Sequence, residues 1–318
     1  MAVRRDRIAT SALVVVAVVI GGAALADSVK KWTHHDHTEP KQHVTVRGVP
    51  LPGRAALAAR LRVAGLDGIL YFVDTRCRLH ALLLPSLASG AVPRNGGCRA
   101  LISPAPAPPG WSLWPRNTPL AARCERRRVI VSPSAGPALP MIGGCAPAWR
   151  PDGAISYIRR GSIVQFPRTG RAEVVRSREQ LGRALERGLG AGTWRVGSVA
   201  WLGPTRFAVV AASGGRRALV VFSGRRITSV ASKIPGSVTD LRASPRGAHV
   251  ALRTPRGLYL YDVGKKRLRR LRGIDAIAWS SDGAWVAIGN SDRVILRRGR
   301  TRIGLPLHVV DLGWTRDT

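Results

Sequence analysis

A nine-residue motif that returns along the chain restricts the fold of this sequence more than any other feature. It begins at Trp149 as W-R-P-D-G-A-I-S-Y, returns at Trp279 as W-S-S-D-G-A-W-V-A and at Ala243 as A-S-P-R-G-A-H-V-A, and has a looser copy at Trp201, W-L-G-P-T-R-F-A-V. In the clearest copies a turn containing Asp or Gly reverses the chain, and alternating apolar residues follow it. The motif therefore predicts antiparallel strands, each with one buried face, joined by tight turns.

Six units of this kind follow one another if the turns Asp67-Gly68 and Pro109-Gly110 are counted as equivalents. Most units are about 35 to 47 residues long, a period typical of a β-sheet repeat, and their turn-rich composition argues against a helical solenoid. We therefore expect an all-β domain over residues 64–318, a six-bladed β-propeller. The segment from His308 to Trp314 is expected to supply a spare strand that closes the ring against the amino-terminal part. The expected units start near residues 64, 106, 149, 201, 243 and 279.

Two short helices are expected beside the strands. Arg54 to Ala64 has Leu57 and Leu61 on one face and is followed by Gly65, which ends the helix. The segment Ser177-Arg178-Glu179-Gln180 is a capping-box pattern, and it precedes an apolar stripe at helical spacing. This second helix is expected either to pack on its own blade or to act as a lid over the mouth of the propeller.

The copies at Trp149 and Trp279 resemble the WD40-like repeats of TolB-type β-propellers, in which Pro-Asp-Gly turns and the strands after them build six blades. The resemblance covers about residues 64 to 314 and implies the propeller fold and a role in the cell envelope through protein contacts. TolB itself has an additional amino-terminal α/β domain. Only some 37 residues separate the apolar segment near the amino terminus from the first repeat here, too few for that domain.

All four cysteines belong to a duplicated block. Cys77 to Cys98 aligns without a gap with Cys124 to Cys145 at an offset of 47 residues, and both blocks end in Gly-Gly-Cys. Four cysteines allow three disulfide connectivities, and the equal spacing favours Cys77–Cys98 together with Cys124–Cys145. A four-cysteine zinc site is the alternative, although the sequence contains no C-x-x-C pair.

The amino terminus predicts export. Residues 1–7 carry three Arg, and residues 8–26 contain no charge over 19 residues, long enough for a helix that crosses the membrane. The basic flank favours a cytoplasmic tail at 1–7, a single-pass anchor at 8–26 and the carboxyl-terminal domain outside the cell membrane. A cleaved signal peptide that ends at Ala24-Leu25-Ala26 is the alternative, and it gives a secreted protein.

Residues 27–63 are expected to form a linker that ends in the first short helix. The linker contains His34, His35 and His37 around Asp36, which are candidate ligands for zinc or copper. A solvated linker without a metal is the competing interpretation, because a flexible tract loses conformational entropy when it binds. No other metal and no cofactor is expected.

The charge of the chain restricts its partners. There are 51 Lys and Arg against 18 Asp and Glu, a formal net charge of +33, and only six of the cations are Lys. An Arg excess spread along the whole chain is what a GC-rich genome produces, and it also attracts anionic surfaces such as phospholipid or wall polymer. Nucleic-acid binding is disfavoured because the Arg runs at 126–128 and 265–272 lie in different repeats instead of one patch.

No catalytic residues are predicted, because the sequence has no nucleophile elbow, zinc-protease helix, phosphate-binding loop or calcium loop. We therefore expect an exported, membrane-tethered binding or scaffolding module whose partner is an envelope protein or an anionic envelope polymer. The sequence does not specify an oligomeric state. The alternative is an extracytoplasmic hydrolase-like enzyme, and it requires that His and carboxylate side chains meet at the propeller channel. The residues to inspect for this are His80, Asp240, His249, Asp262, His308 and Asp311.

Overall fold

The computed structural model describes residues 53–92, 120–125, 128–133, 139–142, 144–150, 154–166 and 172–315. All of them belong to one compact unit, Thr45–Thr318. Within these residues the chain is mostly β-strand with two helices, α2 (Arg54–Val63) and α3 (Arg178–Leu189). Neither helix is long and apolar enough to cross a membrane, and the predicted anchor at 8–26 lies outside the described residues.

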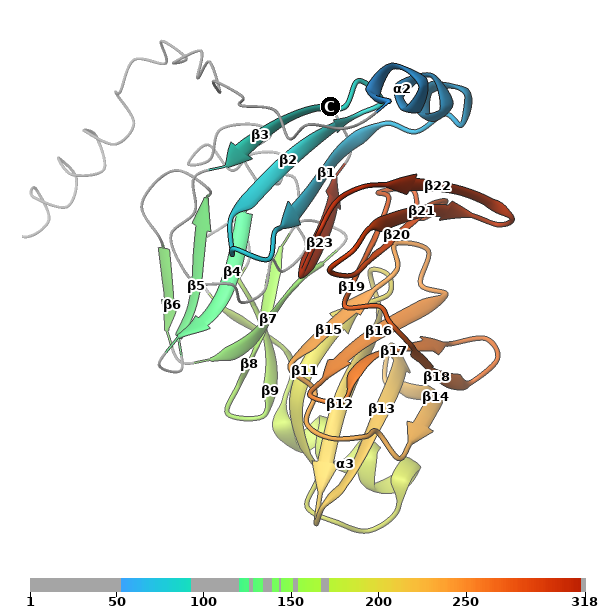
Figure 1. Ribbon diagram of the computed structural model, residues 1–318. Helices are drawn as coiled ribbons and strands as arrows, with labels where there is room; N and C mark the ends of the chain where they lie inside the picture. Colours follow the sequence, from blue (N-terminus) through green and yellow to red (C-terminus); the bar gives the residue numbers. More distant parts are fainter. Residues whose placement is uncertain are drawn as a thin grey trace, which may run out of the picture. The chain divides into compact units, whose positions relative to one another are not determined.

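The described strands form six antiparallel sheets (Figure 1). The first has the order β23-β1-β2-β3, with β23 at Asp311–Thr315, β1 at Gly68–Val73, β2 at Leu79–Leu84 and β3 at Ala88–Val92. The second is three-stranded, with β4 at Leu120–Glu125, β5 at Arg128–Pro133 and β6 at Leu139–Ile142. The third has the order β10-β9-β8-β7, with β7 at Cys145–Trp149, β8 at Ile155–Arg159, β9 at Ser162–Phe166 and β10 at Glu173–Arg176.

The last three sheets are also four-stranded, and their strands are paired in chain order. The fourth sheet contains β11 (Arg195–Trp201), β12 (Arg206–Ser213), β13 (Arg216–Ser223) and β14 (Arg226–Ser232). The fifth contains β15 (Asp240–Ala243), β16 (His249–Thr254), β17 (Gly257–Asp262) and β18 (Arg267–Leu271). The sixth contains β19 (Ala276–Trp279), β20 (Val286–Gly289), β21 (Val294–Arg298) and β22 (Thr301–Leu305).

The first sheet joins the two ends of the described chain. Strand β23 pairs antiparallel with β1, so that Leu70 lies opposite Trp314 and Phe72 lies opposite Leu312. The expectation that the carboxyl-terminal segment supplies a closing strand is therefore confirmed. Successive four-stranded sheets, the first of them completed by the last strand of the chain, are the topology of a β-propeller.

The sequence repeat is offset from the sheets by one strand. Each copy of the motif begins at the last residue of the first strand of a sheet: Trp149 in β7, Trp201 in β11, Ala243 in β15 and Trp279 in β19. The unit starts expected at these residues therefore lie inside the sheets and not at their boundaries. The first strands have no turn signal of their own, which is why the motif marks the hairpin that follows them.

The turn in the Trp279 copy is held by its own side chains. The backbone N–H of Gly283 donates to the Ser280 carbonyl at 2.8 Å, and the Ser280 hydroxyl donates to Asp282 Oδ1 at 2.6 Å. The same carboxylate accepts the backbone N–H of Ala284 at 3.0 Å. These hydrogen bonds, that of Ser280 first, lower the pKa of Asp282 below its ordinary value. In this copy a Ser-x-Asp-Gly sequence thus fixes the hairpin between β19 and β20.

The turns of the copies at Ala243 and Trp279 also pack on the preceding copy of the motif. Gly247 has φ 65°, and a Cβ added to it would lie 2.5 Å from the Leu202 carbonyl oxygen of the previous copy. Gly283 has φ 66°, and its Cβ would lie 2.9 Å from Cγ of Arg246. Glycine is needed at these turns both for the left-handed backbone and for the close approach of the neighbouring sheet.

A Gly247→Ala substitution is therefore expected to lower the free energy of unfolding by more than the strain of the left-handed backbone alone would. Gly299 is the matched control, because it also has a positive φ, 56°, and has no atom within 4 Å of the added Cβ. Gly299→Ala should lower the free energy of unfolding by about 1 kcal/mol, the cost of the left-handed region. Gly247→Ala should exceed this by at least about 1 kcal/mol in urea denaturation. Equal losses for the two variants would show that the contact with Leu202 does not matter.

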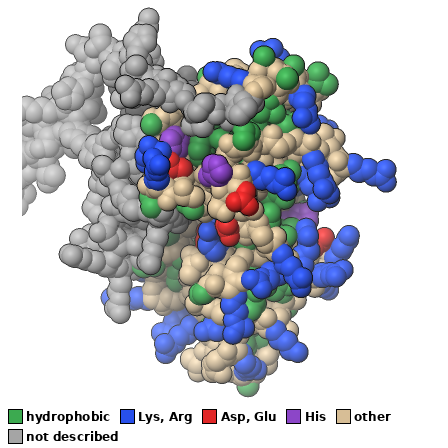
Figure 2. Space-filling model, in the orientation of Figure 1, with side chains coloured by type: hydrophobic (Ala, Val, Ile, Leu, Met, Phe, Trp, Pro, Cys, Tyr) green, Lys and Arg blue, Asp and Glu red, His purple; other side chains and the backbone are tan. Residues whose placement is uncertain are grey.

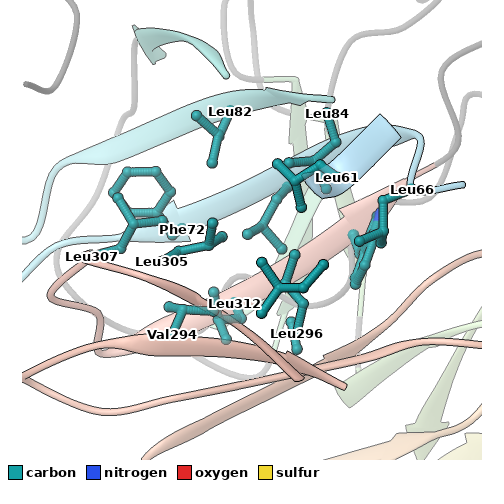
Figure 3. Packing of buried hydrophobic residues seen from close by; sticks show 14 of the residues in the cluster. Leu61, Leu66, Phe72, Leu82, Leu84, Val294, Leu296, Leu305, Leu307 and Leu312 are labelled. Atoms are coloured by element: carbon teal, nitrogen blue, oxygen red, sulfur yellow. The ribbon is translucent and has the colours of Figure 1, made fainter. Parts of the chain in front are cut away.

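Neighbouring sheets share hydrophobic cores. One cluster joins the third and fourth sheets, a second joins the fourth and fifth, and a third joins the fifth and sixth. The largest joins α2, the first sheet and the sixth (Figure 3). In it Leu61 of α2, Leu82 of β2 and Leu296 of β21 are completely buried. Face-to-face packing of successive sheets is what the propeller topology requires.

The two predicted helices are present. Helix α2 buries Leu57 and Leu61 as expected, in the core between the first and sixth sheets. Helix α3 has the predicted capping box at Ser177, and its buried stripe of Leu181, Ala184 and Leu185 packs in the core of the third and fourth sheets. It contacts β9 and β14. Of the two expected arrangements, packing on the sheets describes α3.

Candidate functional site

The six His and Asp candidates lie in three separate places: His80 with His308, Asp240 with Asp311, and His249 with Asp262. The first pair contains only His, the second contains only Asp, and the third combines a His and an Asp of one sheet. No pair therefore brings a candidate His and a candidate Asp together from different sheets. Among the described residues, no group of three or more His, Cys, Asp or Glu side chains could hold a metal ion.

Asp240 and Asp311 meet at the buried Arg242. Nε of Arg242 donates to Asp240 Oδ2 at 2.7 Å, and Nη2 donates to both carboxylate oxygens of Asp311 at 2.9 Å. Nη1 donates to the carbonyl oxygens of Leu312, at 2.6 Å, and Ile277, at 3.3 Å. One guanidinium from β15 thus ties together β15, β19 and β23.

This cluster is a structural joint. Arg242 and Asp311 are 9% and 3% exposed. Burial by itself lowers the pKa of Arg242, but Asp240 and Asp311 outweigh it and raise the pKa above its ordinary value. Arg253 adds a second cation, with Nη2 at 3.3 Å from Asp311 Oδ1. Arg242 and Arg253 thus both engage the carboxylate of Asp311. Sequence reasoning missed Arg242, although its position two residues after Asp240 places both on one face of a strand.

His80 and His308 line one cleft of about 270 Å³. His80 comes from β2, where its ring stacks on Phe72 at 4.9 Å between centroids. His308 lies in the segment between β22 and β23, and its Nδ1 donates to the Ser291 carbonyl. The remaining side chains around the cleft come mainly from the turn between β1 and β2, and the full lining is Phe72, Asp74, Thr75, Arg76, Arg78, Pro306 and Leu307 with the two histidines.

Asp74 orients His80 in this cleft. Asp74 Oδ2 lies 3.0 Å from Nε2 of His80 and 2.9 Å from Nε of Arg78, and Oδ1 accepts the backbone N–H groups of Arg76 and Arg78. A carboxylate accepts, so Nε2 of His80 carries a proton and Nδ1 has the lone pair in the neutral ring. Sequence reasoning missed Asp74, whose signal is an Asp at the start of a hairpin turn.

The hydrogen bonds to Asp74 make stability depend on pH in a defined direction. Burial by itself raises the pKa of Asp74, but the bonds from Arg78 and His80 outweigh it and lower the pKa below the ordinary 3.8. A carboxyl with a lowered pKa in the folded state contributes stability above its ordinary pKa and loses it as the pH falls through the folded-state value. We expect Asp74→Asn to lower the free energy of unfolding at pH 7.

The difference between Asp74→Asn and the wild type should disappear as the pH falls below the folded-state pKa of Asp74. Urea denaturation in steps from pH 7 to about pH 2.5 measures this. A difference that is constant over the whole range would contradict the assignment of these hydrogen bonds to the ionised carboxylate.

His249 and Asp262 lie opposite each other on β16 and β17, with 3.8 Å between Nε2 and Oδ2. Both side chains are partly exposed, at 38% and 31%. The backbone N–H of Lys265 is the main cause that lowers the pKa of Asp262. The pair is an ordinary cross-strand contact, and it lies apart from the other candidates.

The other predicted site residues are only partly described. The candidate metal ligands His34, His35 and His37 lie outside the described residues, and so does Cys98. Cys77 in the first hairpin and Cys145 at the start of β7 are not free thiols. Cys124 lies on β4, which contacts β7, so the predicted Cys124–Cys145 bond would join two sheets. The pairing stays a prediction.

The outer strands of the last two sheets are strongly basic. Strand β18 and the turn before it expose cations from Lys265 to Arg272, and the β21–β22 hairpin exposes Arg297, Arg298, Arg300 and Arg302. We call these residues the basic edge. Figure 2 shows many Lys and Arg side chains and few acidic ones on one face of the molecule. Charged side chains on an edge strand prevent pairing with another sheet, and they also attract anions.

Comparisons with known proteins assign no family to the chain. No family model and no curated protein matches the chain. A solved structure, the β-propeller domain of Cps50 (Swd1) from Myceliophteria thermophila, is similar over 77% of this chain and 82% of its own. The sequence identity is 13% and the TM-score is 0.42.

Proposed function

We propose that the chain is a six-bladed β-propeller of the TolB-like type that is anchored in the membrane by residues 8–26 and binds a partner at the outer face of the cell envelope. The partner is an envelope protein or an anionic envelope polymer. The basic edge carries this proposal, because it places exposed cations on the outermost strands of two neighbouring sheets.

The charge balance supports binding over catalysis. A formal net charge of +33 leaves most cations without a carboxylate of their own. Of the described cations, Arg78, Arg242 and Arg253 form ion pairs with Asp residues. Unpaired surface cations raise the rate of encounter with an anionic partner, and this contribution weakens as salt screens it.

A crosslinking pull-down with the tagged full chain from its own envelope tests the proposal. We expect a retained protein or polymer at about 50 mM salt and clearly less at about 500 mM, where the Debye length is shorter. Neutralisation of the basic edge by Arg267→Gln, Arg269→Gln and Arg270→Gln should reduce polymer retention. Retention that depends neither on the salt concentration nor on the three substitutions would favour a protein partner that binds through shape complementarity. No retention at low salt would overturn the binding function.

A second candidate function is the extracytoplasmic hydrolase, and the cleft with His80 and His308 favours it. Asp74 holds His80 in the tautomer that a general base requires. A panel of hydrolase substrates tests this with the wild type and with His80→Gln. Turnover that is lost in His80→Gln would support the enzyme, and the absence of turnover by the wild type would contradict it.

A further inference from the structure

A second cleft lies beside helix α3, away from the candidates already described. Its volume is about 300 Å³, and four arginines line it: Arg176, Arg183, Arg187 and Arg225. The remaining lining residues are Gln180, Leu181, Ala184 and Phe222. None of these described lining residues is acidic. The three apolar ones are almost completely buried, and the other five are the four arginines and one glutamine.

Helix geometry explains why the arginines gather there. Gln180, Arg183 and Arg187 are three and four residues apart, so they share one face of α3 beside the buried stripe of Leu181 and Leu185. Arg176 is the last residue of β10, before the N-cap. Arg225 comes from the turn between β13 and β14, and α3 packs against β14. Three separate elements thus bring positive charge to one cleft.

Within the described part of the chain, no carboxylate lies within ion-pair distance of these four arginines. No ion pair involves any of them. Glu179 lies one turn before Arg183; the Ser177 hydrogen bond is the main cause that lowers the pKa of Glu179, and the charge of Arg183 is a smaller one. Glu186 lies one position before Arg187, on a different face of the helix, and three positions after Arg183, which it neighbours on the helix surface without an ion pair.

Arg176 supplies an independent observation. Its Nη1 donates to the Val175 carbonyl at 2.8 Å, whereas its Nε is buried and has no hydrogen-bond partner. A buried N–H donor without a partner is costly, so this guanidinium group has hydrogen-bonding capacity that the described residues do not use. The guanidinium group binds planar or tetrahedral oxyanions through two parallel hydrogen bonds, and this geometry suits phosphate especially well.

We propose that this cleft binds the phosphate group of an anionic ligand, with Arg176, Arg183, Arg187 and Arg225 as its donors. The inference deepens the proposed function and rests on it for the source of the phosphate. That source is a phosphate ester, either soluble or in a polymer, or the headgroup of a phospholipid. Both offer the same oxyanion.

Isothermal titration of the full chain in detergent with inorganic pyrophosphate tests the site. We expect saturable binding of one pyrophosphate at low salt. The double variant Arg183→Gln and Arg187→Gln should weaken it at least about tenfold, because each lost bidentate contact is a charge-assisted one. The matched control is Arg60→Gln with Arg62→Gln on α2, which removes the same charge from exposed positions outside both the cleft and the basic edge. It should change the affinity less than about twofold.

Arg225→Gln, a single change in an exposed turn, is the second variant if the helix variant does not fold, and it should also weaken binding. Equal losses in cleft and control variants, or no saturation, would overturn the site. Displacement of pyrophosphate by glycerol 3-phosphate would identify a phosphate ester. Displacement only by nanodiscs with phosphatidylglycerol, and not by phosphatidylcholine alone, would identify a lipid headgroup. Displacement by neither would overturn the proposal.

The two proposals fail separately. If pyrophosphate binds only with an intact cleft and the pull-down retains nothing, the phosphate site stands and the envelope-binding function fails. If the pull-down succeeds and the cleft variants bind pyrophosphate like the wild type, the function stands and the assignment of the site fails.

Discussion

Removal of residues 311–318 is expected to abolish cooperative folding of the described unit. The deletion removes β23, which pairs with β1 along Ile69 to Val73. It also removes the buried side chains of Leu312 and Trp314, and loss of such side chains costs about 2–5 kcal/mol each. The sum approaches the total stability of a typical domain, about 5–15 kcal/mol.

A matched truncation separates the role of the strand from that of the chain end. Removal of residues 316–318 alone leaves the β23 pairing with β1 intact and should not change the midpoint of urea unfolding. For the longer deletion we expect no cooperative transition, or a midpoint lowered so far that the protein is partly unfolded without urea. A cooperative transition with an unchanged midpoint would show that the sheet is stable without its carboxyl-terminal strand.

The sequence predicted the strand hairpins because their signals are local. The turns with Asp and Gly act within a few residues, as in the bonds among Ser280, Asp282 and Gly283, and the apolar alternation after them marks the second strand. The closing strand was also predicted, because the segment from His308 to Trp314 had no partner within its own repeat. Helix α3 was predicted from its capping box, which is equally local.

The first strands of the sheets that carry a motif copy were not predicted as separate strands, because their pairing depends on the hairpin beside them. Strands β15 and β19 have only four residues each, and their pattern does not distinguish them from a loop. Only their pairing with β16 and β20 defines them as strands. Sequence periodicity is a weak signal over four residues. The expected unit starts were therefore placed at the stronger turn signal that follows these strands.

The candidate sites could not be predicted from the sequence because they depend on long-range contacts. Asp240 and Asp311 are 71 positions apart, and Arg242 brings them together across sheets. The arginine cleft likewise combines α3 with the β13–β14 turn, which no spacing rule connects. By contrast, the pairing of His80 with Asp74 lies within one hairpin and could have been found from the turn.

Asp311→Ala is expected to be the most destabilising single substitution of a polar residue in the described structure. It leaves the guanidinium of Arg242, which is 9% exposed, with Asp240 as its one carboxylate. Removing one partner of a buried ion pair typically costs about 3–5 kcal/mol, because the remaining charge is desolvated without compensation. Asp262→Ala is the control, since its partly exposed pair with His249 should contribute less than about 1 kcal/mol.

A double-mutant cycle tests whether the cost of Asp311→Ala comes from the unpaired charge. Arg242→Met removes that charge, so Asp311→Ala should cost clearly less in the Arg242→Met background than in the wild type, with a coupling of about 0.5–3 kcal/mol. Urea denaturation at pH 7 of the wild type, both single variants and the double variant measures the four free energies. If the two losses simply add, or if Asp311→Ala costs no more than Asp262→Ala, the buried cluster does not hold β15, β19 and β23 together.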